Sequence, residues 1–270
     1  MSVQRQTAGD AELPQAASIA FQSFGGGGRP ALLIHGFGSD HLSWLANQPA
    51  LDSVAAMFSL DLPGHGASGM DVGDGAVVTL AQRIAALLDR RGLRKLHLIG
   101  HSLGGGIALI LAATRPDLVA SLVLIAPAGL GSAIDATFLS AFPDLATPLE
   151  ADILLRRLVV RSRLIGKPLI EIVLNQLKKP GSREALRLIA KQLPLDADVL
   201  HAAASVLATA EVPRLVVWGE EDSINPLSRD RLAAFGGEIL IAPGAAHLPH
   251  VENPRLVNAE ISDFLARSRS

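Results

Sequence analysis

The sequence predicts an α/β fold, a mostly parallel sheet flanked by helices, on two observations. Short apolar runs alternate with longer segments of helical spacing, and several of the runs are apolar at every position. Parallel strands joined by helices are buried on both faces and have such runs. The predicted strands are residues 31–34, 57–60, 96–99, 121–126, 215–218 and 238–241. The predicted helices between them are residues 79–91, 102–115 and 254–267.

A stretch without strand signals interrupts this alternation. From Gly131 to Ser205 the pattern is helical throughout, and strand and helix alternate again from Val212. We therefore predict a discontinuous α/β core of residues 1–130 and 206–270, into which a helical cap of residues 131–205 is inserted. The cap helices are expected at residues 149–162, 167–178 and 182–192.

Composition narrows the function classes. The 270 residues are 49% apolar, which is typical of a folded chain, and their formal charge of -2 gives no bias toward nucleic acid or a membrane. No apolar run is long enough to span a bilayer. Without cysteine there is no disulfide, thiolate nucleophile or cysteine metal ligand. Residues 1–18 lack the features of a secretory signal, so we expect a cytoplasmic location. The sequence gives no indication of the oligomeric state.

The most informative segment is residues 96–106, Leu-His-Leu-Ile-Gly-His-Ser-Leu-Gly-Gly-Gly. It places a Gly-x-Ser-x-Gly motif between a predicted strand and a predicted helix, which is the context of a nucleophilic serine on a sharp turn. Gly100 and Gly104 let neighbouring backbone approach closely. Ser102 would also lie at a helix N-terminus, where free N–H groups favour developing negative charge. We predict that Ser102 is the nucleophile.

A serine hydroxyl needs a base to take its proton, so a histidine is expected at the same edge of the sheet. His247 follows the last predicted strand on a glycine-containing loop and meets this expectation. His250, three residues later, is an alternative base, or a partner for His247 at a metal. No convergent carboxylate or further histidine accompanies the pair, so we expect no metal.

The third residue must orient the imidazole and stabilise its charged form. Asp222 follows the preceding predicted strand, and the chain order serine, aspartate, histidine is the one expected for this kind of nucleophile turn. Glu221 is the nearest competitor, although Glu220 and Glu221 are interpreted as a solvated acidic loop. We predict that Asp222 orients the histidine.

A tetrahedral intermediate needs two hydrogen-bond donors for its oxyanion. The run Ile34-His-Gly-Phe-Gly after a predicted strand can bring the Phe37 N–H opposite the Leu103 N–H, which follows the serine. Both donors are backbone groups, and the Phe37 side chain would help to exclude water. We predict that these two N–H groups form the oxyanion hole.

Four motifs together resemble the α/β-hydrolase superfamily, and the resemblance spans nearly the whole chain. They are His-Gly-Phe-Gly at 35–38, Asp-Leu-Pro-Gly-His-Gly-Ala-Ser at 61–68, Gly-His-Ser-Leu-Gly-Gly at 100–105 and Gly-Glu-Glu-Asp at 219–222. The resemblance implies the α/β-hydrolase fold, the triad and the oxyanion roles, and it selects His247 over His250. A serine at position 102 argues against dehalogenase and epoxide-hydrolase chemistry, for which members of this fold use an aspartate.

A finer resemblance concerns Ala-Pro-Ala-Gly-Leu-Gly at residues 126–131 and the predicted cap after it. These are similar to the hydrolase-like carboxyl-terminal domain of acetoin dehydrogenase dihydrolipoyl acetyltransferases. Such acetyltransferases carry an amino-terminal lipoyl domain, for which the residues before Phe21 are too few, so direct membership of such a complex is not expected. The motif His-x-x-x-Asp-Gly of ordinary dihydrolipoyl transferases is also missing. Any acyl transfer would therefore use the serine triad.

These features predict a serine hydrolase that cleaves a small-molecule carboxylic ester or thioester through an acyl-enzyme on Ser102, without a cofactor. Three alternatives stay open. The acyl group passes to a thiol or alcohol instead of water, or the triad serves carbon–carbon bond hydrolysis or cofactor-free haloperoxidase chemistry, or the fold is a ligand-binding module. Neither nucleic acid nor a membrane is an expected partner.

One stretch departs from the acidic balance of the chain. Between Arg156 and Lys191 ten basic residues are opposed only by Glu171 and Glu184. Such a stretch is commonly a solvated helix surface. The alternative is a local positive field that concentrates an anionic substrate or an acidic partner.

Overall fold

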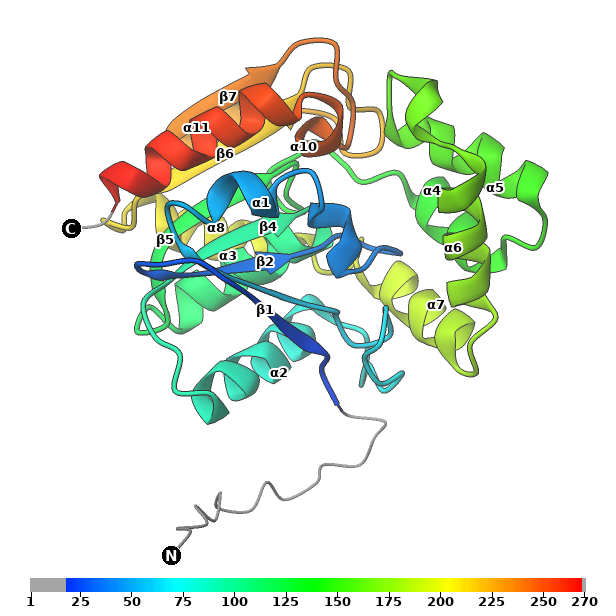
Figure 1. Ribbon diagram of the computed structural model, residues 1–270, viewed down its shortest axis with the longest axis horizontal. Helices are drawn as coiled ribbons and strands as arrows, with labels where there is room; N and C mark the ends of the chain where they lie inside the picture. The colour runs from blue at the N-terminus through cyan, green and yellow to red at the C-terminus, as the bar shows by residue number, and fades with distance from the viewer. Residues whose placement is uncertain (1–17, 269–270) are drawn as a thin grey trace, which may run out of the picture.

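A seven-stranded sheet lies at the centre of the computed structural model, which describes residues 18–268 (Figure 1). The strand order is β1-β3-β2-β4-β5-β6-β7, and every neighbouring pair is parallel except β1 and β3. This arrangement confirms the predicted fold class. The strands are β1 (Phe21–Gly25), β2 (Pro30–Ile34), β3 (Ala56–Leu60), β4 (Leu96–His101), β5 (Val119–Ile125), β6 (Arg214–Gly219) and β7 (Glu238–Ala242).

Burial explains which strands the sequence revealed. All six residues of β4 are buried, as expected for a strand covered on both faces. Each of the six predicted strands begins and ends within two residues of an observed strand. By contrast, β1 lies at the edge of the sheet and four of its five residues are exposed, so it has no apolar run to detect.

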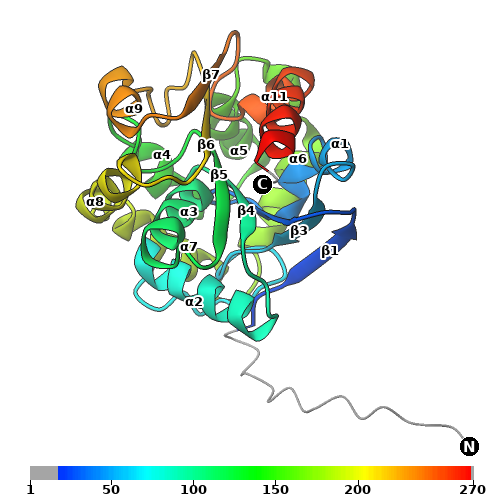
Figure 2. The same ribbon diagram turned by 90° about the vertical axis from the view of Figure 1, so that its left-hand side faces the viewer.

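Two apolar layers cover the sheet. Alternate side chains of β2 point to opposite faces, so that Leu32 and Ile34 pack with α2 and α3 while Leu33 packs with α11. Figure 2 shows α2, α3 and α8 on one face and α1 and α11 on the other. The helices around the sheet are η2 (His41–Trp44, a 3-10 helix), α1 (Gln48–Leu51), α2 (Val77–Arg90), α3 (Leu103–Thr114), α8 (Ala197–Ala208), α9 (Arg229–Phe235), α10 (Pro249–Glu252) and α11 (Pro254–Arg267).

A group of helices stands beside the sheet (Figure 1). We call residues 136–192 the α4–α7 group. It consists of α4 (Ala136–Ala141), η3 (Phe142–Asp144), α5 (Pro148–Leu155), η4 (Arg156–Leu158), η5 (Ser162–Leu164), α6 (Lys167–Leu177) and α7 (Ser182–Gln192). The next helix, α8, packs against α3. The division into a core and a cap of residues 131–205 stays a prediction.

The predicted helix at residues 149–162 is wrong beyond Leu155. There α5 ends, and two short 3-10 helices follow. A continuing helix would require the Val160 N–H to donate to the carbonyl of Arg156. The Val160 N–H instead donates to the carboxylate of Glu252 at 2.9 Å. The helical ladder is already broken at Val159, whose N–H donates to Arg156 O, and the Glu252 carboxylate then keeps Val160 out of a helix, which the local pattern does not reveal.

None of the helices among residues 18–268 combines the length and the apolar character that crossing a membrane requires. The cytoplasmic location stays a prediction. Residues 1–17, which carried most of the argument about a secretory signal, lie outside the described part of the chain.

Candidate active site

Ser102 lies on the sharp turn between β4 and α3. Its backbone has φ 52° and ψ -114°, a conformation that costs a non-glycine residue on the order of 1–3 kcal/mol. The Ser102 N–H donates to Ile125 O at 2.9 Å, and Ser102 O accepts from the N–H groups of Gly106 and Ala128 at 3.0 Å. A Cβ on Gly104 would overlap the carbonyl of the last residue of β2. Backbone contacts therefore hold the strained turn.

The structure brings the three residues of the predicted triad together. His247 Nε2 lies 3.0 Å from Ser102 Oγ, and His247 Nδ1 lies 2.8 Å from Asp222 Oδ2. The other oxygen of Asp222 accepts the N–H groups of Ile224 and Asn225 at 2.9 Å each. Because the carboxylate accepts from Nδ1, that nitrogen carries the proton and Nε2 is free to accept from the serine hydroxyl. All three residues are buried.

The two alternative residues lie elsewhere. The His250 ring packs between Trp44 and His101, with ring centroids 4.9 and 4.8 Å away, and it makes no hydrogen bond to Ser102. Burial lowers the pKa of His250 to about 3, so this imidazole is neutral at neutral pH. Glu221 is exposed to solvent. Hydrogen-bond geometry therefore favours His247 and Asp222.

Two backbone donors stand free where the oxyanion hole is predicted. Leu103 is the first residue of α3, so its N–H has no acceptor within the helix. Within the described part of the chain, neither it nor the Phe37 N–H donates a hydrogen bond. The loop around Phe37 is held by His65, whose Nε2 accepts the Gly38 N–H at 3.0 Å and whose Nδ1 donates to Pro63 O at 2.9 Å.

A second histidine supports the same loop. His35 Nε2 accepts the Leu62 N–H at 2.9 Å, and His35 Nδ1 donates to Gly36 O at 2.8 Å. Burial lowers the pKa of His35 to about 4 and the pKa of His65 to about 3. Both rings are therefore neutral at neutral pH, and each keeps one nitrogen as an acceptor for a backbone N–H.

The 61–68 motif is built around the carboxylate of Asp61. This carboxylate accepts the backbone N–H and the Nδ1 of His41 at 2.8 Å and the Ala67 N–H at 2.7 Å. The Ser68 hydroxyl donates to the Asp61 carbonyl at 2.5 Å. Burial alone would raise the pKa of Asp61, but hydrogen bonds from Ala67 and His41 hold that pKa below its ordinary value. The motif thus forms the rigid segment that carries His65.

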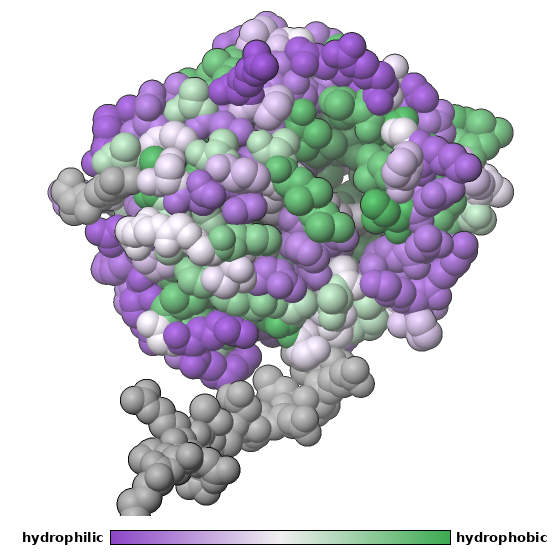
Figure 3. All heavy atoms as spheres, viewed as in Figure 1, coloured by the Kyte–Doolittle hydropathy of each residue, from purple (hydrophilic) through white to green (hydrophobic). Residues whose placement is uncertain are grey.

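Apolar side chains join the Phe37 loop to the α4–α7 group and line a hollow on the surface. The Phe37 ring meets the ring of Phe142 in η3 edge-on, with centroids 5.5 Å apart. Figure 3 shows hydrophobic residues gathered around a hollow between the region of η2 and the α4–α7 group. Exposed large apolar side chains occur on both sides, including Leu45 after η2 and Ile172 on α6.

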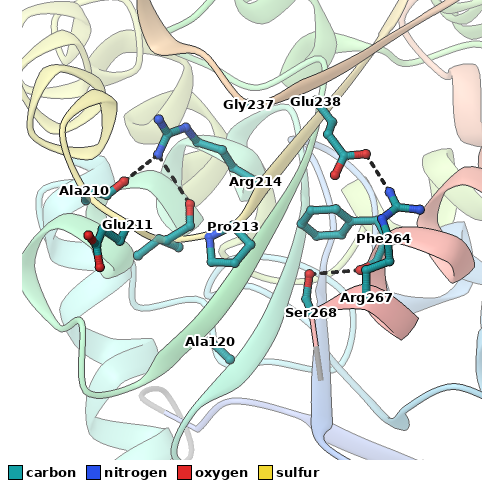
Figure 4. Close-up of a pocket in the computed structure, with 11 residues that line it drawn as sticks. Ala120, Ala210, Glu211, Pro213, Arg214, Gly237, Glu238, Phe264, Arg267 and Ser268 are labelled. Atoms are coloured by element: carbon teal, nitrogen blue, oxygen red, sulfur yellow. Dashed lines mark hydrogen bonds and ion pairs between the residues drawn. The ribbon is translucent and has the colours of Figure 1, made fainter. Parts of the chain in front are cut away.

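A separate surface pocket lies at the opposite edge of the sheet. It measures about 670 Å³ and is lined by the first residues of β6 and β7, Arg214 and Glu238, together with Arg267 (Figure 4). Arg214 donates to backbone carbonyls such as Ala210 O at 3.0 Å, and Arg267 donates to Glu238 at 2.6 Å. Because the predicted triad lies at the carboxyl ends of the strands, this pocket is separate from it. No cluster of His, Asp or Glu side chains among the described residues is arranged to hold a metal.

Sequence reasoning missed residues that support the triad. The Asn225 amide donates to the carbonyls of Ala126 and Pro127 at 3.0 and 2.9 Å, which ties the Asp222 loop to the end of β5. His101 Nε2 donates to the carbonyl of His247 at 2.9 Å. His101 occupies a variable position of the serine motif and was open to detection there. Asn225 has no comparable signal.

With this geometry established, comparison with known proteins identifies the family. The model of the alpha/beta hydrolase family matches residues 31–260. The chain belongs to the alpha/beta hydrolase family. Among alpha/beta hydrolases of known structure, a meta-cleavage product hydrolase from Pseudomonas fluorescens IP01 superposes with a TM-score of 0.80 at 20% identity, over 94% of this chain and 97% of that one. Likeness at this identity shows the shared fold alone.

Two curated relatives are more similar in sequence. A dihydrolipoyllysine-residue acetyltransferase component of an acetoin cleaving system from Pseudomonas putida is 37% identical over 260 residues, which cover 94% of this chain and 70% of the relative. A pimeloyl acyl-carrier protein methyl ester esterase from Neisseria meningitidis serogroup B is 30% identical over 253 residues, which cover 86% and 91%. The family and the likeness to acetoin-system acetyltransferases, both expected from sequence motifs, are confirmed.

Proposed function

We propose that the chain is a serine hydrolase that cleaves a small-molecule carboxylic ester or thioester through an acyl-enzyme on Ser102. The observation that carries this proposal is the hydrogen-bond chain from Ser102 Oγ through His247 to Asp222, with distances of 3.0 and 2.8 Å. Both distances allow general-base transfer of the serine proton. The reaction needs no cofactor, because these side chains and two backbone N–H groups supply every chemical role.

In the acylation step, Ser102 Oγ attacks the acyl carbon while its proton moves to His247 Nε2. The carbonyl oxygen becomes an oxyanion and accepts the N–H groups of Phe37 and Leu103. Each such donor contributes on the order of 10²- to 10³-fold to the rate. Asp222 stabilises the imidazolium, which then protonates the departing alcohol or thiol as the carbon–oxygen or carbon–sulfur bond breaks.

In the deacylation step, water takes the place of the departed group. His247 Nε2 accepts a proton from the water, whose oxygen attacks the acyl carbon, and the oxyanion again accepts from Phe37 and Leu103. Collapse of this intermediate releases a carboxylic acid and returns the proton from His247 to Ser102 Oγ. The enzyme is regenerated without a net change.

The substrate side of the proposal rests on the apolar hollow beside η2 (Figure 3). We expect the α4–α7 group to act as a cap over Ser102 and the acyl portion of the substrate to be apolar, since an apolar wall offers a polar acyl group no hydrogen bonds. The 30% identity to a methyl ester esterase, over most of both chains, supports ester hydrolysis.

The test combines a covalent probe with a substrate panel. A fluorophosphonate should label Ser102, and Ser102→Ala should remove labelling and lower turnover of short- to long-chain esters and thioesters by at least about 10⁴-fold. Ser205→Ala is the matched control, because Ser205 is exposed on α8. Labelling of another serine, or a diketone turned over faster than every ester, contradicts the proposal. A single acylation without further turnover would indicate a ligand-binding module.

A second candidate is transfer of the acyl group to a thiol rather than to water. The 37% identity to an acetoin-system acetyltransferase component favours it. Adding a dithiol such as dihydrolipoamide to a thioester assay should then divert the acyl group into a new thioester at the expense of free acid. An unchanged yield of acid at saturating dithiol restricts the enzyme to hydrolysis.

A further inference from the structure

Glu252 is a buried carboxylate held by three backbone N–H groups from two separate parts of the chain. It is 1% exposed at the end of α10. One oxygen accepts the Ala246 N–H at 2.6 Å. The other accepts the N–H groups of Val160 and Arg161, each at 2.9 Å. The first contact is local, whereas the second reaches into the α4–α7 group.

The Arg161 side chain adds hydrogen bonds beside the contact between Glu252 and the N–H groups of residues 160 and 161. Its guanidinium donates to the backbone carbonyl of Glu252 at 2.6 Å and to the side-chain oxygen of Asn253 at 2.8 Å. The Asn253 amide in turn donates to Pro243 O at 2.8 Å. Residues 160 and 161 are therefore joined, through Glu252 and Asn253, to Ala246 and Pro243 in the loop that runs from β7 to α10.

This loop carries His247. The Glu252 contact fixes the N–H of the preceding residue, Ala246, while His101 fixes the carbonyl of His247 itself. The backbone on each side of the imidazole is thus held by one buried side chain. Of these two supports, only Glu252 also touches residues 160 and 161.

We propose that Glu252 is a positioning residue that couples docking of the α4–α7 group to the alignment of His247 with Ser102; this inference rests on the serine-hydrolase function proposed above. If residues 160 and 161 move away, the carboxylate loses two of its three N–H donors in a site closed to water. An underpaired buried charge is costly. The docked position of these residues and the held position of Ala246 therefore stabilise each other.

The main test is Glu252→Gln, assayed with a short ester. The amide has a single acceptor oxygen, so it satisfies either Ala246 or the Val160 and Arg161 pair, and its NH2 group faces donors on the other side. We expect kcat to fall roughly 10- to 100-fold while KM changes little, because misplacement of a reacting group costs rate rather than binding. The rate of fluorophosphonate labelling at Ser102 should fall by the same factor.

A second variant keeps the test decisive if Glu252→Gln does not fold. Arg161→Met removes the guanidinium but leaves all three N–H contacts of the carboxylate, and should lower kcat and the labelling rate by a smaller factor of about 3- to 10-fold. The control is Arg163→Gln. Arg163 is exposed in the same segment and makes no hydrogen bond or ion pair within the described residues, so this variant should match the wild type.

The outcomes separate this inference from the proposed function. Wild-type protein that is not labelled at Ser102 overturns the serine-hydrolase function. Labelling at Ser102 with unchanged kcat and labelling rate in folded Glu252→Gln, or in Arg161→Met, overturns the coupling alone. The variant that combines Glu252→Gln with Arg161→Met gives a further check. If the two residues are coupled, its kcat should be only a little lower than that of Glu252→Gln alone. Fully additive losses would mean that the two residues act independently.

Discussion

The two segments that form the Ser102 and His247 pair are held in different ways. The Ser102 turn is fixed by backbone groups of β5 and the loop after it, in a conformation that is strained for serine. The His247 loop is fixed partly by backbone, since the Glu221 N–H donates to Ala245 O at 2.9 Å, and partly by side chains, since Glu252 accepts the Ala246 N–H and His101 donates to the His247 carbonyl. One half of the site thus depends on main-chain geometry, and the other depends in addition on the identity of two buried side chains, Glu252 and His101.

This difference teaches where the molecule is sensitive. Near Ser102, substitution of Gly100 or Gly104 would place a Cβ against neighbouring backbone, and substitution of Ser102 itself acts through its positive φ. Around His247, part of that role falls to Glu252 and His101, whose hydrogen bonds a single substitution removes. The following experiments test that contrast, beginning with the largest effect.

Asp222→Asn should lower turnover by about four orders of magnitude without unfolding the protein. The amide can present its NH2 group to His247, which favours the wrong tautomer and leaves Nε2 unable to accept the serine proton. Steady-state kinetics on a neutral ester measures the loss. Glu221→Gln is the matched control and should retain wild-type turnover, since Glu221 is exposed. Similar losses in both variants would move the orienting role away from Asp222.

Buried histidines around the site should make the protein sensitive to acid. Burial lowers the pKa of His35 to about 4, of His65 and His250 to about 3, and that of His101 well below its ordinary value. These imidazoles stay neutral in the folded protein, while the unfolded chain protonates them below about pH 6.5. Their contribution to the stability of the folded protein is complete above about pH 6.5, and it is lost as the pH falls toward 4 to 3.

Urea unfolding at a series of pH values measures this effect. Near pH 5 the unfolded chain binds about four more protons at these sites, so the free energy of unfolding should fall by roughly 5 kcal/mol per pH unit. His250→Leu should reduce this slope by about one proton, or roughly 1.4 kcal/mol per pH unit. An unchanged slope in His250→Leu would show that His250 is charged in the folded protein.

Backbone strain at the Ser102 turn predicts a substitution that raises stability, by less than acid lowers it. Ser102→Gly should abolish activity yet raise the free energy of unfolding by about 1 kcal/mol, because relief of the positive φ outweighs the greater chain entropy of glycine. Chemical denaturation compares it with Ser102→Ala, which keeps a Cβ and should show no such gain. Equal stability of the two variants would mean that the turn stores no strain.

The smallest effect is expected at the exposed basic surface. Arg156 donates to Asp152 at 2.7 Å, and both side chains reach solvent. Arg156→Gln should leave the free energy of unfolding almost unchanged, because solvent screens an exposed ion pair. The ratio of kcat/KM for a carboxylate-bearing ester to that for a neutral ester should change less than about two-fold. A ten-fold drop in this ratio would support the positive-field hypothesis.

Local patterns predicted the fold, and they singled out three residues that the structure brings together, for identifiable reasons. Interior strands can be recognised in the sequence by their apolar runs. Because these strands are parallel, the carboxyl ends of β4, β6 and β7 lie at one edge of the sheet. A residue such as Asp222, directly after a strand, can therefore be assigned to that edge from the chain alone. Ser102 adds a glycine pattern that only a tight turn requires.

The remaining features depend on partners that are distant in sequence. Nothing near Val160 indicates that the Glu252 carboxylate accepts its N–H. The basic stretch had few acidic residues within it, yet Arg157 and Arg187 pair with Asp135 and Asp144 from outside it. Such pairings become visible only once the chain is folded.

The pocket of Figure 4 also has a practical meaning for how the molecule can be tethered. Arg267 and Ser268, at the end of α11, lie beside this pocket at the amino ends of the strands, while Ser102 lies at the carboxyl ends. A linker, immobilisation tag or second protein attached beyond Ser268 would lie at the edge of the sheet opposite the apolar hollow of Figure 3. Substrate would then approach from bulk solution, and the attached body would not stand in its path.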